Sequence, residues 1–208
     1  MVWSSPYDNF KIFILIKNNL PIFPLGLVAL PGSIQSLQIF EPRYVNMIKS
    51  CMSENHGFVI VLQNNEIKDF EISKKGTYVE IIYFNNLPNG LLGITVKSEN
   101  KVSLKNIYQL EDGLHIAEIK PEIDPEVDNQ ALIAEYPEII NILSQLIKHP
   151  KINELPIKVD FNSADSIAYH LAGLIPLSMS QRQNLLEAFD ASQRLSILSK
   201  YIEKISTI

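Results

Sequence analysis

Short runs of β-branched and aromatic residues, separated by turn residues, occupy the chain from residue 20 to about residue 121. Such runs are typical of the strands of a compact sheet or barrel. The clearest runs are residues 34–40, 58–62, 77–84, 91–97, 101–108 and 114–119. Pro88-Asn89-Gly90 and Glu111-Asp112-Gly113 contain residues that tolerate positive φ, so each of these turns predicts a hairpin between the runs on either side.

One helix is predicted among the strands. Pro42 suits a first helical position, and an apolar face with a period of 3.6 residues follows it. This face consists of Tyr44, Val45, Ile48 and Met52. We expect the helix to cover one end of the sheet.

The periodicity becomes helical after an acidic connector at residues 121–128. One apolar stripe is formed by Leu132, Ile139, Ile140, Leu143, Leu146 and Ile147. Pro137 either kinks this helix or resets its start, and His149-Pro150 ends it. Three more helices are predicted after Ser163, Ser178 and Asp190, the last two with the spacing of capping boxes. The pattern predicts an α+β protein with a compact sheet or barrel over residues 20–121 and a helical bundle over residues 122–208, and residues 1–19 precede it as an N-terminal extension.

Composition limits the classes of partner. A net charge of −5 and scattered lysines and arginines give no basic patch, so no nucleic-acid partner is expected. Lys97, Lys101 and Lys105 are interpreted as solvated strand and turn lysines. The single cysteine, Cys51, excludes an intramolecular disulfide and fits a cytoplasmic location. The apolar run at residues 10–16 is too short for a membrane span and lacks the features of a signal peptide, so no membrane partner is expected.

Catalytic chemistry is not indicated by any motif. No phosphate-binding loop occurs, and His56, His115, His149 and His170 are too widely spaced in the sequence to suggest a metal site. Cys51 precedes His56 by five residues, but a catalytic pair would need a third, orienting group, so a half-buried structural cysteine is expected. Asp160 and Asp165 are assigned to the start of a helix, and Pro31-Gly32-Ser33 to a turn. We predict no enzymatic activity and no cofactor.

Residues 20–44 carry a longer pattern, LPIFPLGLVALPGSIQSLQIFEPRY. A proline-flanked apolar strand, a Pro31-Gly32 turn, a second strand and then Phe40-Glu41-x-Arg43-Tyr44 resemble the opening of the LON domain, the N-terminal substrate-recognition domain of the ATP-dependent protease Lon. The resemblance continues through Leu87-Pro88-Asn89-Gly90 and residues 171–178 to about residue 205. It implies a PUA-like barrel followed by helices.

The resemblance also implies a function. Lon carries its ATPase and Ser-Lys peptidase modules after this region, and neither is recognisable here, so we expect a non-catalytic module that binds a polypeptide client or protein partner and presents it to a separate protease or chaperone. The candidate binding residues are Phe40, Glu41, Arg43, Tyr44, Phe84 and Tyr108. For Glu41 and Arg43, a structural ion pair is the stronger interpretation. Aromatic residues on strands are also more often core residues than anchors.

Two alternatives remain open at this point. The first is a small-molecule-binding protein or an enzyme that uses a cleft between the two halves. RNA binding is the second, because PUA-like folds occur in RNA-modification proteins, although the acidic charge opposes it. The family usually has Gly-x-x-Arg-aromatic where this chain has Ser98-Glu99-Asn100-Lys101-Val102, so no contact made through that arginine or ring is carried over. The sequence leaves the oligomeric state open.

Overall fold

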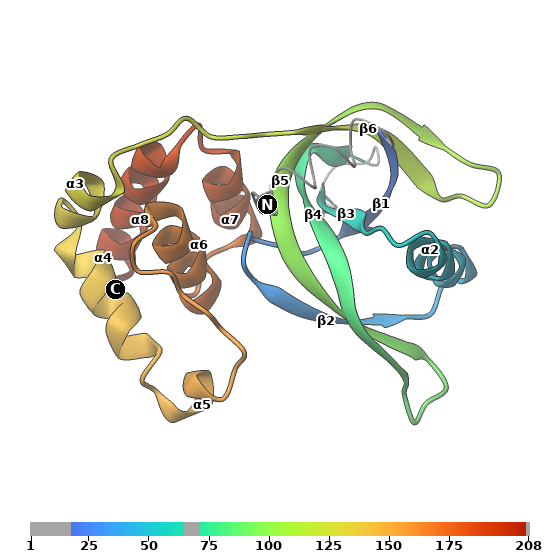
Figure 1. Ribbon diagram of the computed structural model, residues 1–208, viewed down its shortest axis with the longest axis horizontal. Helices are drawn as coiled ribbons and strands as arrows, with labels where there is room; N and C mark the ends of the chain where they lie inside the picture. Colours follow the sequence, from blue (N-terminus) through green and yellow to red (C-terminus); the bar gives the residue numbers. More distant parts are fainter. Residues whose placement is uncertain (1–17, 65–70, 207–208) are drawn as a thin grey trace, which may run out of the picture. The chain divides into compact units, whose positions relative to one another are not determined.

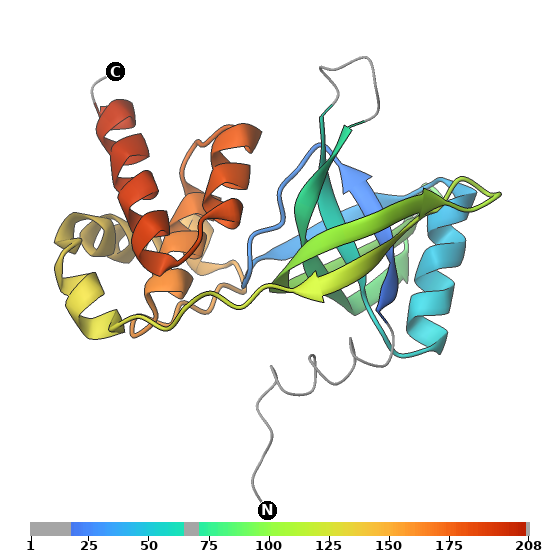
Figure 2. The same ribbon diagram turned by 90° about the horizontal axis from the view of Figure 1, so that it is seen from above.

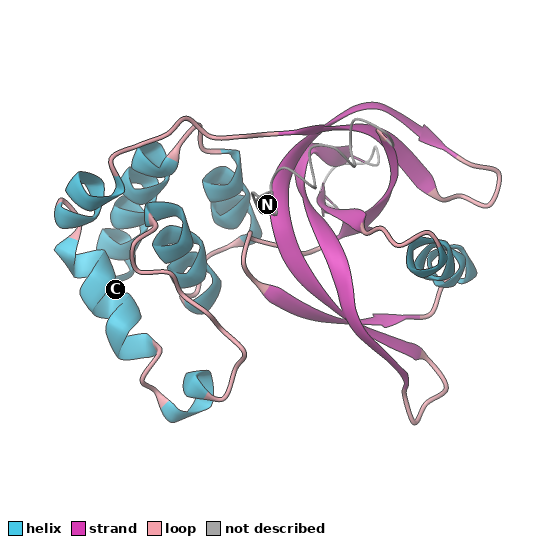
Figure 3. Ribbon diagram, in the orientation of Figure 1, coloured by secondary structure: helices cyan, strands magenta, loops and turns pink. Residues whose placement is uncertain are grey.

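The computed structural model describes residues 18–64 and 71–206, so most of the predicted N-terminal extension lies outside the described residues. The chain divides into two compact units. The first, here called the sheet unit, contains the described residues up to Leu27 together with Gln35–Glu122. The second, the helical unit, contains Val28–Ile34 and the residues from Ile123 onward. Strands gather in the sheet unit, and every described helix except α2 lies in the helical unit (Figure 3).

The described strands form a mixed, six-stranded sheet in the order β2-β5-β4-β3-β1-β6. They are β1 (Asn19–Leu25), β2 (Ile34–Ile39), β3 (Phe58–Asn64), β4 (Glu71–Asn86), β5 (Leu92–Gln109) and β6 (His115–Pro121). Strands β1 and β3 are parallel, whereas β1–β6, β3–β4, β4–β5 and β5–β6 are antiparallel. Because β5 pairs with both β4 and β6, the sheet closes on itself, and β2 pairs with β5 (Figures 1 and 2). The predicted α+β class is confirmed.

Both predicted hairpins are present. In the first, the Leu87 N–H donates to the Leu91 carbonyl at 2.8 Å and Gly90 has φ of 80°. In the second, the Leu110 N–H donates to the Leu114 carbonyl at 2.8 Å and Gly113 has φ of 85°. These positive φ values explain why glycine ends each turn.

One strand was wrongly divided by the sequence pattern, because residues 91–97 and 101–108 belong to the single strand β5. The polar Ser98 pairs with Val79 and Lys101 pairs with Thr77, with a register shift between them, so the ladder continues through the interruption. Ser98 is buried. The interpretation of Lys101 as a solvated lysine is also wrong: its side chain is only 6% exposed, and its Nζ lies 4.0 Å from a carboxylate oxygen of Glu122.

The core of the sheet unit is built by inward-facing residues of every strand in the closed ring. They are Leu20, Ile22, Val59, Val61, Tyr78, Val102, Leu104, Ala117 and Ile119. Helix α2 (Pro42–Ser53) begins at Pro42 as predicted and lies beside the sheet (Figures 1 and 2). Its buried face contains Met47 and Cys51 where the pattern placed Val45 and Met52, and Tyr44 of this face packs on Phe23 of β1. Cys51 is fully buried, not half-buried.

The helical unit contains six described helices. They are α3 (Asn129–Ala134), α4 (Pro137–Leu146), α5 (Pro150–Asn153), α6 (Ala164–Leu174), α7 (Met179–Glu187) and α8 (Ala191–Ser206). Pro137 resets the start of α4, and Pro150 starts the short α5, which the sequence pattern did not predict. The Ser178–Gln181 capping box is present, and the Asp190 carboxylate accepts a hydrogen bond from the Gln193 N–H at 2.7 Å, as the spacing predicted.

Arg194 on α8 carries its positive charge on a fully buried side chain. Its guanidinium donates to the carboxylates of Asp124, at 2.6 Å, and of Asp165, and its Nε donates to the Leu185 carbonyl at 3.0 Å. It also lies 4.3 Å from the centre of the Tyr169 ring. Burial alone would lower the pKa of Arg194, but the ring and the two carboxylates raise it above its usual value. Arg194 thus ties the connector before α3 to α6, α7 and α8.

The Pro31-Gly32 turn belongs to the helical unit, although it precedes most of the sheet in sequence. The Ser33 N–H donates to the Leu30 carbonyl at 3.0 Å, and Val28, Ala29 and Leu30 are buried. Gly32 has φ of 82°, and a Cβ there would lie 3.0 Å from the His170 ring on α6. The chain therefore leaves the sheet after β1, packs among the helices and returns as β2.

Replacing Arg194 tests its importance. Arg194→Met leaves Asp124 and Asp165 without their cation, so we expect the free energy of unfolding of the helical unit to fall by about 3 kcal/mol. Urea unfolding followed by far-ultraviolet circular dichroism measures this change. Lys200→Met, an exposed position on the same helix, is the control and should change stability by less than about 0.5 kcal/mol. An equal effect of both variants would contradict the assignment.

Candidate functional site

The predicted residues Glu41 and Arg43 hold a corner of the sheet unit together. The Arg43 guanidinium lies 2.6 Å from the Glu41 carboxylate and donates to the Gly113 carbonyl at 3.1 Å. Gln109 donates to the same carbonyl at 3.0 Å. Arg43 therefore ties the start of α2 to the turn between β5 and β6. Burial and the charge of Arg43 lower the pKa of His115, which follows this turn.

The four predicted aromatic residues lie in different surroundings. Phe40, Phe84 and Tyr108 are 69%, 54% and 49% exposed. Tyr44 is only 5% exposed and packs on Phe23 with ring centres 4.1 Å apart, so it supports the corner from inside. Phe84 pairs with Ile94 near the start of β5, whereas Tyr108 pairs with Ile116 near its end. The structure therefore does not bring the six predicted residues into one site.

A second exposed apolar set lies on the projecting part of β4. Ile82 and Tyr83 are 50% and 60% exposed, and they directly precede Phe84. The pairing of β4 with β3 ends at Val79, and from Glu80 onward no other described strand lies along that edge. In the sequence, this surface corresponds to the apolar run before the Pro88-Asn89-Gly90 turn. The pattern assigned that run to a strand but did not show that the strand extends beyond its neighbour.

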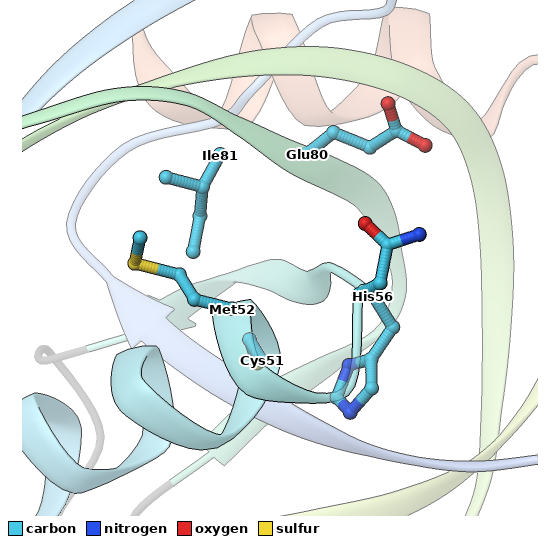
Figure 4. Close-up of a pocket in the computed structure, with 6 residues that line it drawn as sticks. Cys51, Met52, His56, Glu80 and Ile81 are labelled. Atoms are coloured by element: carbon cyan, nitrogen blue, oxygen red, sulfur yellow. The ribbon is translucent and has the colours of Figure 1, made fainter.

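A pocket of about 380 Å³ opens where β4 passes the end of β3. It is lined by Cys51, Met52, Asn55, His56, Glu80 and Ile81. Figure 4 shows Glu80 and Ile81 projecting from the strand, while Cys51, Met52 and His56 come from the end of α2 and the residues after it. Sequence reasoning singled out Cys51 and His56 but did not connect them with Glu80, because only the fold brings β4 next to α2.

The backbone of Gly57 organises the floor of this pocket. Its carbonyl faces the Nδ1 of His56 at 2.7 Å and the Sγ of Cys51 at 3.5 Å. Its N–H donates to the Tyr78 hydroxyl at 2.8 Å. Burial raises the pKa of Tyr78 to about 12, so the phenol stays neutral and accepts this bond. These contacts support the expected structural role of Cys51.

Glu80 is the carboxylate at the pocket mouth. Partial burial raises its pKa above the usual value, Glu99 raises it further, and Lys97 opposes the shift. Lys97 pairs with Glu80 across the ladder, yet its Nζ lies 2.6 Å from the Glu99 carboxylate. No described residue forms a hydrogen bond or ion pair with the Glu80 carboxylate.

Metal binding and membrane insertion find no support among the described residues. Within residues 18–64 and 71–206, no three histidine, cysteine or acidic side chains gather as a metal ion would require. Asp165 pairs with Arg194, and an oxygen of the Asp160 carboxylate accepts the Asn162 N–H at 2.9 Å, so both have structural partners. In the same part of the chain, no helix has the length and apolar character needed to cross a membrane.

The fold and the surface describe an α+β chain whose closed sheet exposes apolar side chains beside an open strand edge. Comparison with known families is consistent with this description, because residues 19–204 match the model of the ATP-dependent protease La (LON) substrate-binding domain. The chain belongs to this family.

Two Lon proteases are similar to this chain at low sequence identity. The chain is 24% identical to the Lon protease of Heliobacterium modesticaldum over 197 residues, which cover 89% of this chain and 24% of that protein. It is 24% identical to Lon protease 1 of Bacillus subtilis over 198 residues, which cover 90% of this chain and 25% of that protein. The chain thus spans about a quarter of the length of these curated relatives.

Two solved structures share the fold. The Lon N-terminal domain protein from Xanthomonas campestris is 25% identical, with a TM-score of 0.71 and coverage of 88% of this chain and 98% of that chain. The N-terminal domain of the Mycobacterium avium complex Lon protease is 17% identical, with a TM-score of 0.67 and coverage of 88% and 97%. The family, which sequence motifs had indicated, is therefore established over most of the chain.

Gly57 should not tolerate a side chain. A Cβ at this position would lie 1.8 Å from the Val79 carbonyl oxygen, so Gly57→Ala must push β4 away from the pocket. We expect a loss of about 3 kcal/mol or more in the free energy of unfolding. Gly26→Ala is the matched control, because a Cβ there meets nothing within 4 Å. Similar thermal unfolding of the two variants would refute the close approach.

Tyr78 should titrate well above the ordinary pKa of tyrosine. Its folded pKa of about 12 lies above the ordinary value of 10.0, so its contribution to stability is present below pH 10 and is lost as the pH rises toward 12. In an ultraviolet absorbance titration, Tyr78→Phe should remove the component near pH 12. The variant should also lose about 1–3 kcal/mol of stability, because the Gly57 N–H loses its acceptor. A late component that persists in Tyr78→Phe would disprove the assignment.

Proposed function

We propose that this chain is a polypeptide-recognition module that binds exposed apolar segments of unfolded or specific clients and presents them to a separate protease or chaperone. In this proposal the chain does no chemistry itself. Its closed sheet is the PUA-like barrel of the LON domain, and its helices form the accompanying bundle. The family name, a substrate-binding domain, supports recognition as the role.

The observation that carries the proposal is the exposed apolar run on β4. Ile82, Tyr83 and Phe84 are each at least 50% exposed and are consecutive on one strand. Large apolar side chains gathered on a surface are typical of sites that bind another chain. The adjoining strand edge offers backbone donors and acceptors that pair with any extended sequence, which suits a module that must accept varied clients.

A second contact region is the corner held by Arg43. Phe40 precedes the Glu41–Arg43 ion pair, and Tyr108 precedes Gln109, which bonds to the same turn as Arg43. In the proposal, Phe40 and Tyr108 contact the client, whereas Glu41, Arg43 and Tyr44 hold the corner in place. This division assigns a role to each of the six residues that the sequence suggested.

Removing the exposed apolar side chains on β4 tests the proposal. Ile82→Thr combined with Phe84→Thr keeps β-forming residues but removes apolar area, so affinity for a permanently unfolded polypeptide should fall about tenfold. Fluorescence anisotropy with reduced, carboxymethylated α-lactalbumin measures this affinity, and native α-lactalbumin is the folded comparison. The wild-type chain should bind the unfolded form and not the folded one.

Phe189→Thr provides the matched control, because Phe189 is 68% exposed and lies in the helical unit. It should leave the affinity unchanged. Phe40→Thr with Tyr108→Thr tests the corner in the same assay. Polypeptide recognition would be refuted if the wild-type chain did not bind the unfolded polypeptide. The assignment of the surface would be refuted if the β4 variant and the Phe189 variant lost affinity equally.

A further inference from the structure

The outer edge of β4 from Glu80 to Asn86 is a place where a strand can be added. On its other side this segment pairs with β5, from Glu80 opposite Lys97 to Asn86 opposite Leu92, with a register shift between Ile81 and Tyr83. No described strand continues beyond Val79 on the β3 side. Every second residue of such an edge presents its N–H and C=O outward, where an extended chain can pair with them.

The pocket beside Glu80 lies at the inner end of this edge. Glu80 and Ile81, the first residues of this edge, form one side of the pocket, and residues from α2 and from the segment before β3 form the other. Met52 and Ile81 supply an apolar wall, and Met52 is 40% exposed (Figure 4). The Glu80 carboxylate at the mouth has no partner among the described residues.

The charges around the pocket favour a cation. The nearby Lys97 is already paired with Glu99 at 2.6 Å. Glu54, at the end of α2, lies 3.6 Å from the Nε2 of His56, one of the residues that line the pocket. Lysine and arginine side chains match this arrangement, because an aliphatic stem packs on an apolar wall while the charged end reaches a carboxylate.

We propose that a client segment pairs with the outer edge of β4 and places a lysine or arginine side chain in the pocket, against Glu80. The inference rests on the proposed function and narrows its substrate class to extended apolar segments that carry a basic residue. Backbone pairing supplies affinity for any extended chain, and the exposed apolar residues of β4 favour apolar residues in the client segment. Glu80 favours a lysine or arginine at the client position that enters the pocket.

Three short fluorescent peptides test the proposal with the full chain. They share an alternating valine, threonine and phenylalanine sequence and differ at one central residue, which is lysine, norleucine or glutamate. Fluorescence anisotropy should show the lysine peptide binding about tenfold more tightly than the norleucine peptide, because a charge-assisted contact is gained, and the glutamate peptide binding most weakly. Unfolded carboxymethylated α-lactalbumin is measured in parallel.

Variants of Glu80 separate charge recognition from general binding. Glu80→Gln should equalise the lysine and norleucine peptides while leaving the norleucine affinity unchanged. Glu80→Lys should reverse the preference toward the glutamate peptide. Glu111→Gln makes the same change of charge at an exposed turn position and should retain the wild-type preference. Equal thermal unfolding of Glu80→Gln and the wild type shows that the fold is kept.

The outcomes distinguish this inference from the proposed function. If unfolded α-lactalbumin binds but the three peptides bind equally, or Glu80→Gln weakens all of them alike, the basic-residue pocket is wrong and polypeptide recognition stands. If neither the peptides nor the unfolded polypeptide binds, both proposals fail. Competition by Nα-acetyl-arginine amide as effective as that by the unlabelled lysine peptide would show a site for small cations, which overturns the client assignment.

Discussion

The sheet unit depends on the pairing of β5 along two neighbours. This strand of 18 residues pairs with β4 over its first part and with β6 over its last part, and the second pairing closes the sheet. Strand β4 has 16 residues and pairs with β5 from Lys75 to Asn86, but β3 has only 7 residues. The unequal lengths mean that a closed sheet, which normally hides its edges, leaves one edge of β4 open. The exposed apolar residues and the pocket both lie along that segment.

A second constraint fixes where β3 begins. The backbone of Gly57 approaches the Val79 carbonyl so closely that only glycine fits, and the Tyr78 hydroxyl holds the Gly57 N–H. The end of α2 is thereby brought against β4, which places Met52 and His56 beside Glu80. The Gly57 backbone is bonded by His56, Cys51 and Tyr78, whereas no described residue forms a hydrogen bond or ion pair with the Glu80 carboxylate.

The helical unit is organised by a different interaction, a buried cation. Arg194 bonds to Asp124 before α3, to Asp165 in the first turn of α6 and to the Leu185 carbonyl of α7. Because a buried guanidinium is costly unless every partner is in place, Arg194 favours one arrangement of these elements over looser packings of their apolar faces. The Pro31-Gly32 turn of the family signature also packs here, on His170. Part of the signature therefore belongs to the helical unit, although the strands on either side of it belong to the sheet.

The sequence by itself determined what depends on near neighbours in the chain. Hairpin turns, helix starts at Pro42 and Ser178, and the family motif are local, and the structure or the comparisons confirmed them. Tertiary structure decided what depends on distant partners. Lys101 is buried because β5 continues through a polar stretch and Glu122 lies nearby, and Tyr44 is buried because Phe23 packs on it. The open edge of β4 and the pocket at Glu80 follow from the difference in length between the neighbouring strands β3 and β4. The local sequence pattern does not show which strand extends beyond its neighbour. This surface could therefore be identified only from the tertiary structure.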